Sequence, residues 1–310
     1  MKYLVVGAGL AGLTAARHLQ ALGGQATVLE KGRGPGGRMA TRRIGGQRFD
    51  HGAQYLTATS PRFRSAVEGW RAAGVAEEWF REGGRARYRG VAGMNAIPKY
   101  LAAVLDVRLN SRIVEMAWRG GEWHLRTEAG EEHCGAGLVV TAPVPQALEL
   151  LGGVAGRMEG RLKRIRYTSC FALMAALDGD SGLGEAGFVE PGEGPVQWIA
   201  DNARKGITEG PGAVTIHATA AFTSSHYDEP AERVAGLMLE AAQGWLGGSG
   251  VREWQLHRWR YSMAETREAE PCLAMKEPGP LVLAGDGFGF PGVEGAFLSG
   301  FAAAMALSEM

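Results

Sequence analysis

A glycine-rich turn near the start of the chain constrains the fold most. Residues 2–6 form a short apolar run typical of a strand buried on both faces, and Gly7, Gly9 and Gly12 follow it with the spacing GxGxxG. Residues 10–29 then have the pattern of a helix followed by a second apolar strand. This order predicts a Rossmann-type unit, in which the glycines allow a tight turn and a close approach of backbone to a pyrophosphate.

The residues around this turn favour dinucleotide binding over a turn that binds nothing. Glu30 ends the second strand at the distance where a carboxylate binds both hydroxyls of a ribose, and its charge disfavours a 2′-phosphate there. A helix that begins at Leu10 and Ala11 would direct its amide groups and its positive end at the phosphates. We therefore include these residues, together with Lys31, in the candidate cofactor site.

Composition and charge exclude several other classes of protein. Lys plus Arg equals Asp plus Glu at 33 each, which argues against nucleic-acid binding through bulk charge. No run of 18 apolar residues predicts a membrane span, and the three cysteines have no metal-binding spacing, so we expect neither a metal nor a membrane partner. Free thiols favour a cytoplasmic protein, whereas the alternative of an N-terminal signal peptide conflicts with the spacing of the glycines.

The pattern along the chain predicts an α/β fold with a discontinuous first domain. The run PLVLA at 280–284 again has the character of a buried parallel strand, although the strands expected in 155–275 are typical of an antiparallel sheet. We expect a Rossmann-type domain and an α+β substrate domain with a mostly antiparallel sheet. The first would take residues 1–57, 93–150 and 276–310, and the second residues 58–92 and 151–275.

Four separated motifs carry a resemblance to a known family. They are GRGPGGRMATRR from Gly32, FDHGAQYLTA from Phe49, HRWRYS from His257 and GDGFGFPGVEGAFLSG from Gly285. With the turn and the acidic residue before them, they make the chain similar to the FAD-dependent amine-oxidase-like flavoproteins, and most similar to the renalase-like branch. The resemblance covers nearly the whole chain.

The resemblance implies FAD as a non-covalent cofactor and assigns roles to individual residues. Gly37 and Arg38 of the GGR motif would contact the pyrophosphate, Ile113 would reach the adenine through its backbone, and Asp286 would bind the ribityl or phosphate portion. The residues expected to border the flavin ring are Gln54, Tyr55, Val293, Glu294 and Gly295. A helix that starts at the last three would stabilise the negative charge of a reduced flavin.

The substrate should bind directly at the flavin, because the chain has no second GxGxxG after a strand. Candidate catalytic residues are His257, Tyr55 and Trp259. Alternation along the strand that contains His257 and Trp259 puts Arg258 on the opposite face. Arg258 or Lys205, expected near the entrance, would hold substrate phosphates. His217, alone on an apolar strand, fits a core histidine better than a site residue, and Arg42 and Arg43 receive no role.

Renalase-like enzymes oxidise dihydropyridine isomers of NAD(P)H, so the resemblance implies hydride transfer from such a small molecule to flavin N5, with oxygen as the acceptor. Loss of hydride makes the pyridine ring aromatic, so orientation suffices and no strong base is needed. Three alternatives stay open: an amine oxidase, a desaturase of the same fold, and a flavin-binding protein without turnover.

Overall fold

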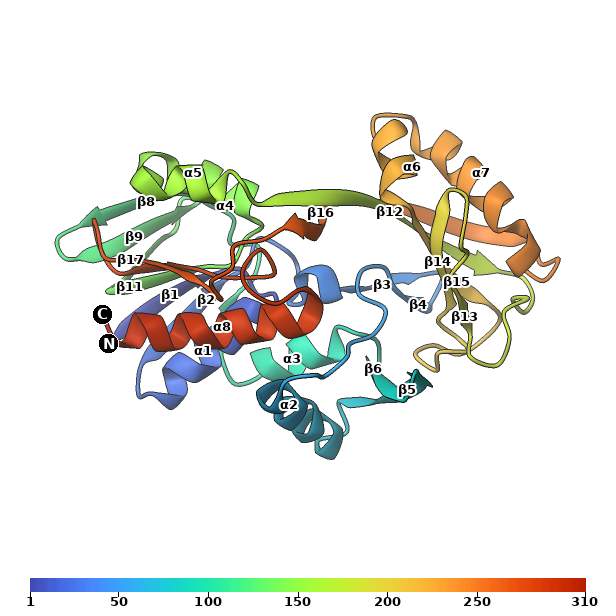
Figure 1. Ribbon diagram of the computed structural model, residues 1–310, viewed down its shortest axis with the longest axis horizontal. Coiled ribbons are helices and arrows are strands. Elements are labelled where there is room, and N and C mark those ends of the chain that lie inside the picture. Colours follow the sequence, from blue (N-terminus) through green and yellow to red (C-terminus); the bar gives the residue numbers. More distant parts are fainter.

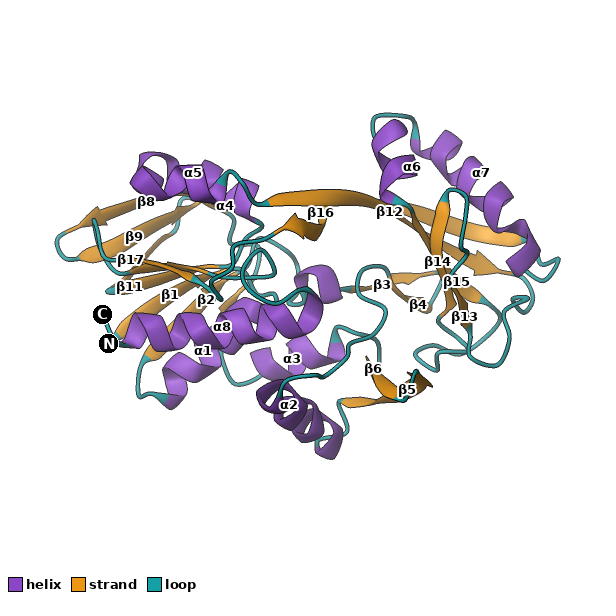
Figure 2. Ribbon diagram, viewed as in Figure 1, coloured by secondary structure: helices purple, strands orange, loops and turns teal.

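The chain forms two lobes joined by a long two-stranded ladder (Figure 1). The computed structural model describes residues 1–310. The first lobe has a mainly parallel sheet, and the second has an antiparallel sheet with helices packed on it (Figure 2). The predicted α/β class, with a Rossmann-type part and a mostly antiparallel second sheet, is therefore confirmed. None of the helices combines the length and the apolar character that a membrane span requires.

A six-stranded sheet organises the first lobe, in the order β17-β18-β11-β1-β2-β7. All neighbouring pairs are parallel except β17 with β18. The strands are β1 (Lys2–Val6), β2 (Gln25–Leu29), β7 (Asp106–Arg108), β11 (Gly137–Val140), β17 (Leu273–Met275) and β18 (Leu281–Leu283). The predicted strand at 2–6 is confirmed at the centre of the sheet, between segments that are distant in the sequence.

The two faces of this sheet pack on different elements. Tyr3 and Val5 belong to a core shared with helices, whereas Leu4 belongs to a core shared with a β-meander. The helices are α1 (Leu10–Ala21), α2 (Pro61–Ala72), α3 (Ala96–Ala102) and α8 (Gly292–Ser308). On the other face lie β8 (Ile113–Arg119), β9 (Glu122–Thr127), β10 (Glu132–Gly135), α4 (Val144–Leu151), α5 (Glu159–Leu162) and the 3-10 helix η2 (Gly152–Met158). Burial on both faces explains why β1 is continuously apolar.

The second lobe is a five-stranded antiparallel sheet in the order β13-β14-β15-β12-β16. Its strands are β12 (Arg166–Leu177), β13 (Phe188–Val189), β14 (Val196–Asp201), β15 (Ala213–Ala218) and β16 (Val251–Thr266). Helices cover one face: α6 (Ala220–Ser225), α7 (Ala231–Ala242) and the 3-10 helix η3 (Gln243–Trp245). β12 and β16 are the longest strands, and they form the ladder that runs between the lobes (Figure 1).

A hairpin of β3 (Thr41–Ile44) and β4 (Gln47–Asp50) extends from the first lobe to the uncovered face of the second sheet (Figure 1). Ile44 and Phe49 pack there in one apolar cluster with residues of β12 and β15. In the hairpin register Thr41 lies opposite Asp50, and Arg43 lies opposite Arg48. These four residues share the face that points away from the second sheet.

The expected domain limits stay a prediction, but three segments pack across them. α2, at the start of 58–92, buries Phe63, Val67 and Trp70 in the helical core of the first lobe. β17 lies before residue 276 and joins the first sheet, and Leu162 of α5 packs in the meander core. Of residues 58–92, the two-stranded sheet of β5 (Ala76–Glu82) and β6 (Arg85–Gly90) brings Phe80 to aromatic rings of the second lobe.

The helices α1 and α8 approach closely because Gly300 of α8 has no side chain. A Cβ at Gly300 would lie 2.1 Å from the carbonyl oxygen of Ala11. Contacts under 3.0 Å between such atoms are essentially never seen, so a larger residue would force the two helices apart. The position of α8, and with it the start of α8 near the site, depends on this contact.

We predict that Gly300→Ala lowers the free energy of unfolding by about 1–3 kcal/mol, because overpacking outweighs the gain in helix propensity. Urea denaturation would measure it. Gly236→Ala in α7 is the matched control, since that glycine faces open space. It should raise stability by about 0.5–1 kcal/mol. Equal effects of the two substitutions would contradict the close approach.

Candidate active site

The β1–α1 turn has the geometry that dinucleotide binding requires. Gly7 has φ +104°, and a Cβ at Gly12 would lie 1.9 Å from the carbonyl oxygen of Gly7. A Cβ at Gly9 would meet no atom within 4 Å, so the turn is open on that side. Leu10 and Ala11 begin α1 directly after it, with their amide groups at the helix end. The turn therefore offers amide donors to an open space.

The carboxylate of Glu30 lies beside this turn, at the end of β2. Its Oε2 accepts a hydrogen bond of 2.7 Å from the amide of Ala8, and its Oε1 accepts one of 2.6 Å from Gly32. Ser111 donates its amide to the carbonyl of Glu30, which brings the start of β8, at Ile113, close to this end of the sheet. Lys31 turns away and donates to Gln146.

Arg38 and Asp286 come together from opposite ends of the chain. The guanidinium of Arg38 donates two hydrogen bonds of 2.5 Å, one to each carboxylate oxygen of Asp286. It also donates to the carbonyl of Ser262 at 3.2 Å, in the ladder between the lobes. Gly37 begins the 3-10 helix η1 (Gly37–Met39), and Gly285 with φ +132° turns the chain after β18. Two predicted cofactor residues thus form one bidentate pair.

The start of α8 is held by close backbone contacts. The carboxylate of Glu294 is buried and accepts hydrogen bonds from the amides of Thr59 and Ser60, at 2.9 and 2.6 Å. A Cβ at Gly295 would lie 1.6 Å from the carbonyl oxygen of Phe290. The side chain of Glu294 therefore anchors the loop before α2. A contact between the flavin and the backbone of Val293, Glu294 or Gly295 stays a prediction.

Gln54 and Tyr55, both predicted to border the flavin, lie where the first lobe contacts the second. Gln54 donates to the carbonyls of Asp50 and Gly52, whereas its own Oε1 is buried without a partner. The ring of Tyr55 lies 5.6 Å from Trp198 and 5.7 Å from Phe80. Burial raises the pKa of the Tyr55 hydroxyl, against the opposing charge of Arg87. These aromatic rings form an apolar wall.

A cluster of imidazole and indole rings lies at the contact of the two lobes. His257 and Trp259 of β16 both pack on His51, with ring centres 5.0 and 5.2 Å away. The carbonyl of His51 accepts two hydrogen bonds, from Nε1 of Trp259 at 2.7 Å and from Nε2 of His217 at 3.2 Å. Because a carbonyl only accepts, His217 carries its proton on Nε2.

All three histidines of this cluster are neutral near pH 7. Burial, with the nearby His257, Arg42 and His217, lowers the pKa of His51 to about 3. Burial lowers the pKa of His217 to about 4, and burial together with Arg42 lowers that of His257 to about 4. His51 was not among the site residues predicted from the sequence, although it lies in the motif FDHGAQYLTA.

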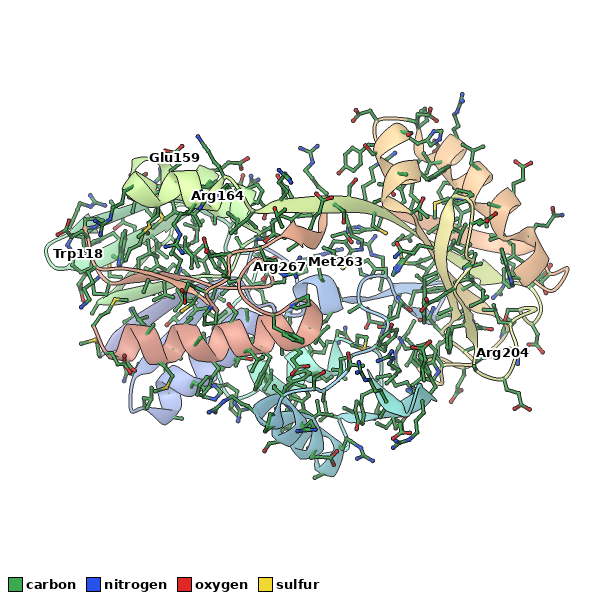
Figure 3. All side chains as sticks on the ribbon, in the orientation of Figure 1. Trp118, Glu159, Arg164, Arg204, Met263 and Arg267 are labelled. Carbon is green, nitrogen blue, oxygen red and sulfur yellow. The ribbon has the colours of Figure 1, made fainter.

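Lys205 was expected at the entrance and is instead buried in an ion pair, so that prediction is wrong. Its Nζ donates to Oδ2 of Asp50 at 2.7 Å and to the carbonyl of Gln54 at 2.5 Å. Neither charged side chain is exposed. Burial lowers the pKa of Lys205, and Asp50 opposes that shift. The adjacent Arg204 lies at the rim of the second lobe (Figure 3).

Arg258 also fails as a phosphate partner, because it lies on the helical face of the second sheet. Its guanidinium donates to the carbonyl of Glu229 at 2.6 Å and lies over the ring of Phe171. The predicted alternation is confirmed, since His257 and Trp259 point to the opposite face. Arg42 is the cation on that opposite side, close enough to shift the pKa of two histidines.

Several features fit a bound FAD. Buried polar atoms usually have partners, yet Oε1 of Gln54 and Nδ1 of His51 have none. The turn at Gly9 is open, and the carboxylate of Glu30 lies beside it. The segment of Arg38 is joined to both parts by backbone hydrogen bonds, from Gly36 to Ala8 and from Ala53 to Arg38, and Arg38 pairs with Asp286. The residues present can therefore hold a long, anionic, partly aromatic cofactor.

Two family models match the chain. Residues 5–70 match an NAD(P)-binding Rossmann-like domain, and residues 71–308 match the flavin containing amine oxidoreductase family. Renalase from Mus musculus is 26% identical over 325 aligned residues, which cover 93% of each chain.

Solved structures share the fold at low identity. A putative protoporphyrinogen oxidase from Exiguobacterium sp. 255-15 has a TM-score of 0.74 at 12% identity, over 100% of this chain and 99% of that one. A triple mutant of putrescine oxidase has a TM-score of 0.75 at 13% identity, over 99% and 98%.

Because the three histidines are neutral in the folded protein, its free energy of unfolding should fall at acidic pH. Unfolded histidines gain protons below about pH 6.5, whereas these native ones do not until about pH 3 to 4, so stability falls as pH drops through that window. His217→Gln should lower the slope of unfolding free energy against pH by up to about 1.4 kcal/mol per pH unit. Denaturant titrations from pH 4 to 7 measure this, with His124→Gln of β9 as control. A slope unchanged by His217→Gln would refute the neutral state.

We expect Arg38, which pairs with Asp286, to be needed for the protein to retain FAD. Arg38→Ala should purify with much less FAD, because it removes the one guanidinium at this point and leaves Asp286 unpaired. The ratio of flavin absorbance to protein measures the loss. Arg126→Ala, which breaks an exposed arginine–glutamate pair on the meander, should keep full flavin. A fully yellow Arg38→Ala protein would rule out the phosphate role.

Proposed function

Because the chain belongs to the flavin containing amine oxidoreductase family and is an FAD-dependent oxidoreductase, we propose that it oxidises a dihydropyridine isomer of NAD(P)H. The hydride would leave position 2 or 6 of the nicotinamide ring, and NAD(P)+ would form. When bound, FAD would supply the hydride acceptor at N5 and pass both electrons to oxygen. Oxygen would take up these two electrons, the proton of the hydride and one further proton, and hydrogen peroxide would form. The renalase relative and the four motifs support this substrate class.

The neutral histidine cluster is the observation that carries the proposal. A dihydropyridine ring becomes a cation when it loses hydride, so a nearby imidazolium would oppose the reaction. Burial holds the pKa values of His51 and His257 near 3 and 4, and both rings are uncharged at neutral pH. They therefore contribute polar and stacking contacts without repelling the product.

The chain's carboxylates give little support to an amine substrate. A carboxylate without a partner would be needed to bind the ammonium group of an amine, but each buried carboxylate already has hydrogen-bond partners. Asp50 pairs with Lys205, Asp286 with Arg38, and Glu294 with two backbone amides. Asp201 is the fourth, and it accepts from Ser181 and from the amides of Ala203 and Ala213.

The proposed roles of the site residues follow from their positions. His257 and Trp259 would orient the nicotinamide from β16, and Tyr55 would limit the pocket on the side of the aromatic wall. Arg42 would bind a substrate phosphate, in place of Lys205 and Arg258, because it is the cation beside the histidine cluster. No proton transfer at carbon is required of any of them.

Anaerobic stopped-flow spectroscopy tests the proposal. The 2-dihydro and 6-dihydro isomers of NAD(P)H should bleach the flavin absorbance, whereas ordinary NADH and a panel of amines should do so at least about 100-fold more slowly. Arg42→Gln should raise the concentration of isomer needed for half-maximal rate and leave the maximal rate nearly unchanged. Fast bleaching by an amine alone would overturn the proposal in favour of an amine oxidase, and no bleaching by any donor would favour a binding protein.

A further inference from the structure

A second cationic site lies apart from the dinucleotide and histidine residues. A cavity of about 350 Å³ is bounded by Thr41, Arg43 and Arg48 of the β3–β4 hairpin and by Asn95 and Lys99 at α3. Figure 1 shows the hairpin between the two lobes, with α3 on the side of the first lobe. The cavity has the size of the smaller ligand pockets in proteins.

The charges of this cavity are unbalanced. Arg43 and Arg48 lie directly opposite each other in the antiparallel ladder, an arrangement in which like charges destabilise the pair. None of Arg43, Arg48 and Lys99 forms an ion pair, although the protein as a whole has equal numbers of acidic and basic residues. Three uncompensated cations therefore surround one space.

The frame of the cavity is fixed by hydrogen bonds. Nη1 of Arg48 donates to the carbonyl of Ile207 at 3.3 Å, and the backbone amide of Arg48 donates to Thr208. Thr41 donates to Asp50 and accepts from the amide of Asn95, which holds the start of α3 against β3. A guanidinium has five donors, so Arg48 keeps most of its own for a ligand.

We propose that this cavity binds the phosphate group of a small phosphorylated molecule. A phosphate dianion has three terminal oxygens and can accept from all three cations at once, whereas a carboxylate offers only two oxygens. The alanines at 92 and 96 leave room beside the cations for an uncharged portion. Arg43 and Arg42 thus serve different spaces, because neighbouring residues of a strand point to opposite faces.

This inference does not depend on the proposed reaction. None of the residues that bound the cavity belongs to the β1–α1 turn, the Arg38–Asp286 pair or the histidine cluster. The ligand would be held on the hairpin face that points away from the second sheet. It can therefore be tested on the FAD-loaded protein, in which the cofactor site is filled, with variants of Arg43 and Arg48 that leave Arg42 of the proposed substrate site unchanged.

Isothermal titration of the FAD-loaded protein at low ionic strength is the test, with AMP, adenosine, inorganic phosphate and malonate as probes. AMP and phosphate should bind, and adenosine should not. The double variant Arg43→Gln/Arg48→Gln should weaken AMP binding by about tenfold or more. Arg64→Gln, which removes an exposed arginine of α2, is the matched control and should change nothing.

Thermal denaturation keeps the test independent of folding. Removing the opposed charge by Arg43→Gln alone, which leaves the hydrogen bond of Arg48 to Ile207 intact, should leave Tm equal or higher at low salt, and the FAD content of the double variant should be unchanged. Equal AMP affinity in the double variant and the wild type, no AMP binding by the wild type, or tighter binding of malonate than of phosphate would each overturn the phosphate site. A clearly lower Tm of Arg43→Gln would contradict the unbalanced repulsion.

Discussion

The buried ion pair of Asp50 and Lys205 holds the site together. Asp50 ends the hairpin from the first lobe, whereas Lys205 follows β14 in the second. The other oxygen of Asp50 accepts from Thr41 and from the amide of Met94, so one carboxylate joins three segments of chain. Burying both charges costs several kcal/mol per ion, and only such complete hydrogen bonding offsets that cost. His51 and Gln54 follow directly, and their places depend on it.

The two faces of the hairpin also differ in their electrostatic environment. On the side of the second sheet Arg42 is the cation, and burial together with Arg42 keeps the histidines uncharged, so that no imidazolium adds to its charge. On the other side Arg43 and Arg48 have no counter-charge, and the space suits an anion. Alternation along β3 places the side chains of Arg42 and Arg43 in these two different spaces. A single short hairpin can therefore serve two different ligands.

The sequence predicted those parts of the fold whose signals are local. Glycine spacing and apolar runs predicted the β1–α1 turn, Glu30 and the buried strands. The motifs of Arg38 and Asp286 were each predicted to bind the cofactor, but the sequence did not show that the two side chains form a pair. The burial of Lys205 could not be predicted, because its partner is 155 residues away and a lysine in a polar loop normally faces solvent. The role of His51 depends on its backbone carbonyl, which no residue pattern reveals. Arg258 was placed on the correct face, but only the helices on that face show that it cannot meet a substrate.

The discontinuous first sheet has a consequence for synthesis of the chain. β1, β2 and β11 are available early, but β18 and α8 emerge from the ribosome only after the entire second sheet. The face of α1 that meets Gly300 stays uncovered during that interval, as does the edge of β11. Arg38 likewise has no Asp286 to pair with until 248 further residues have been translated. The nascent protein therefore has a nearly complete second lobe before it can close the first around a cofactor, and chaperones would find their exposed apolar surface on the older half of the chain.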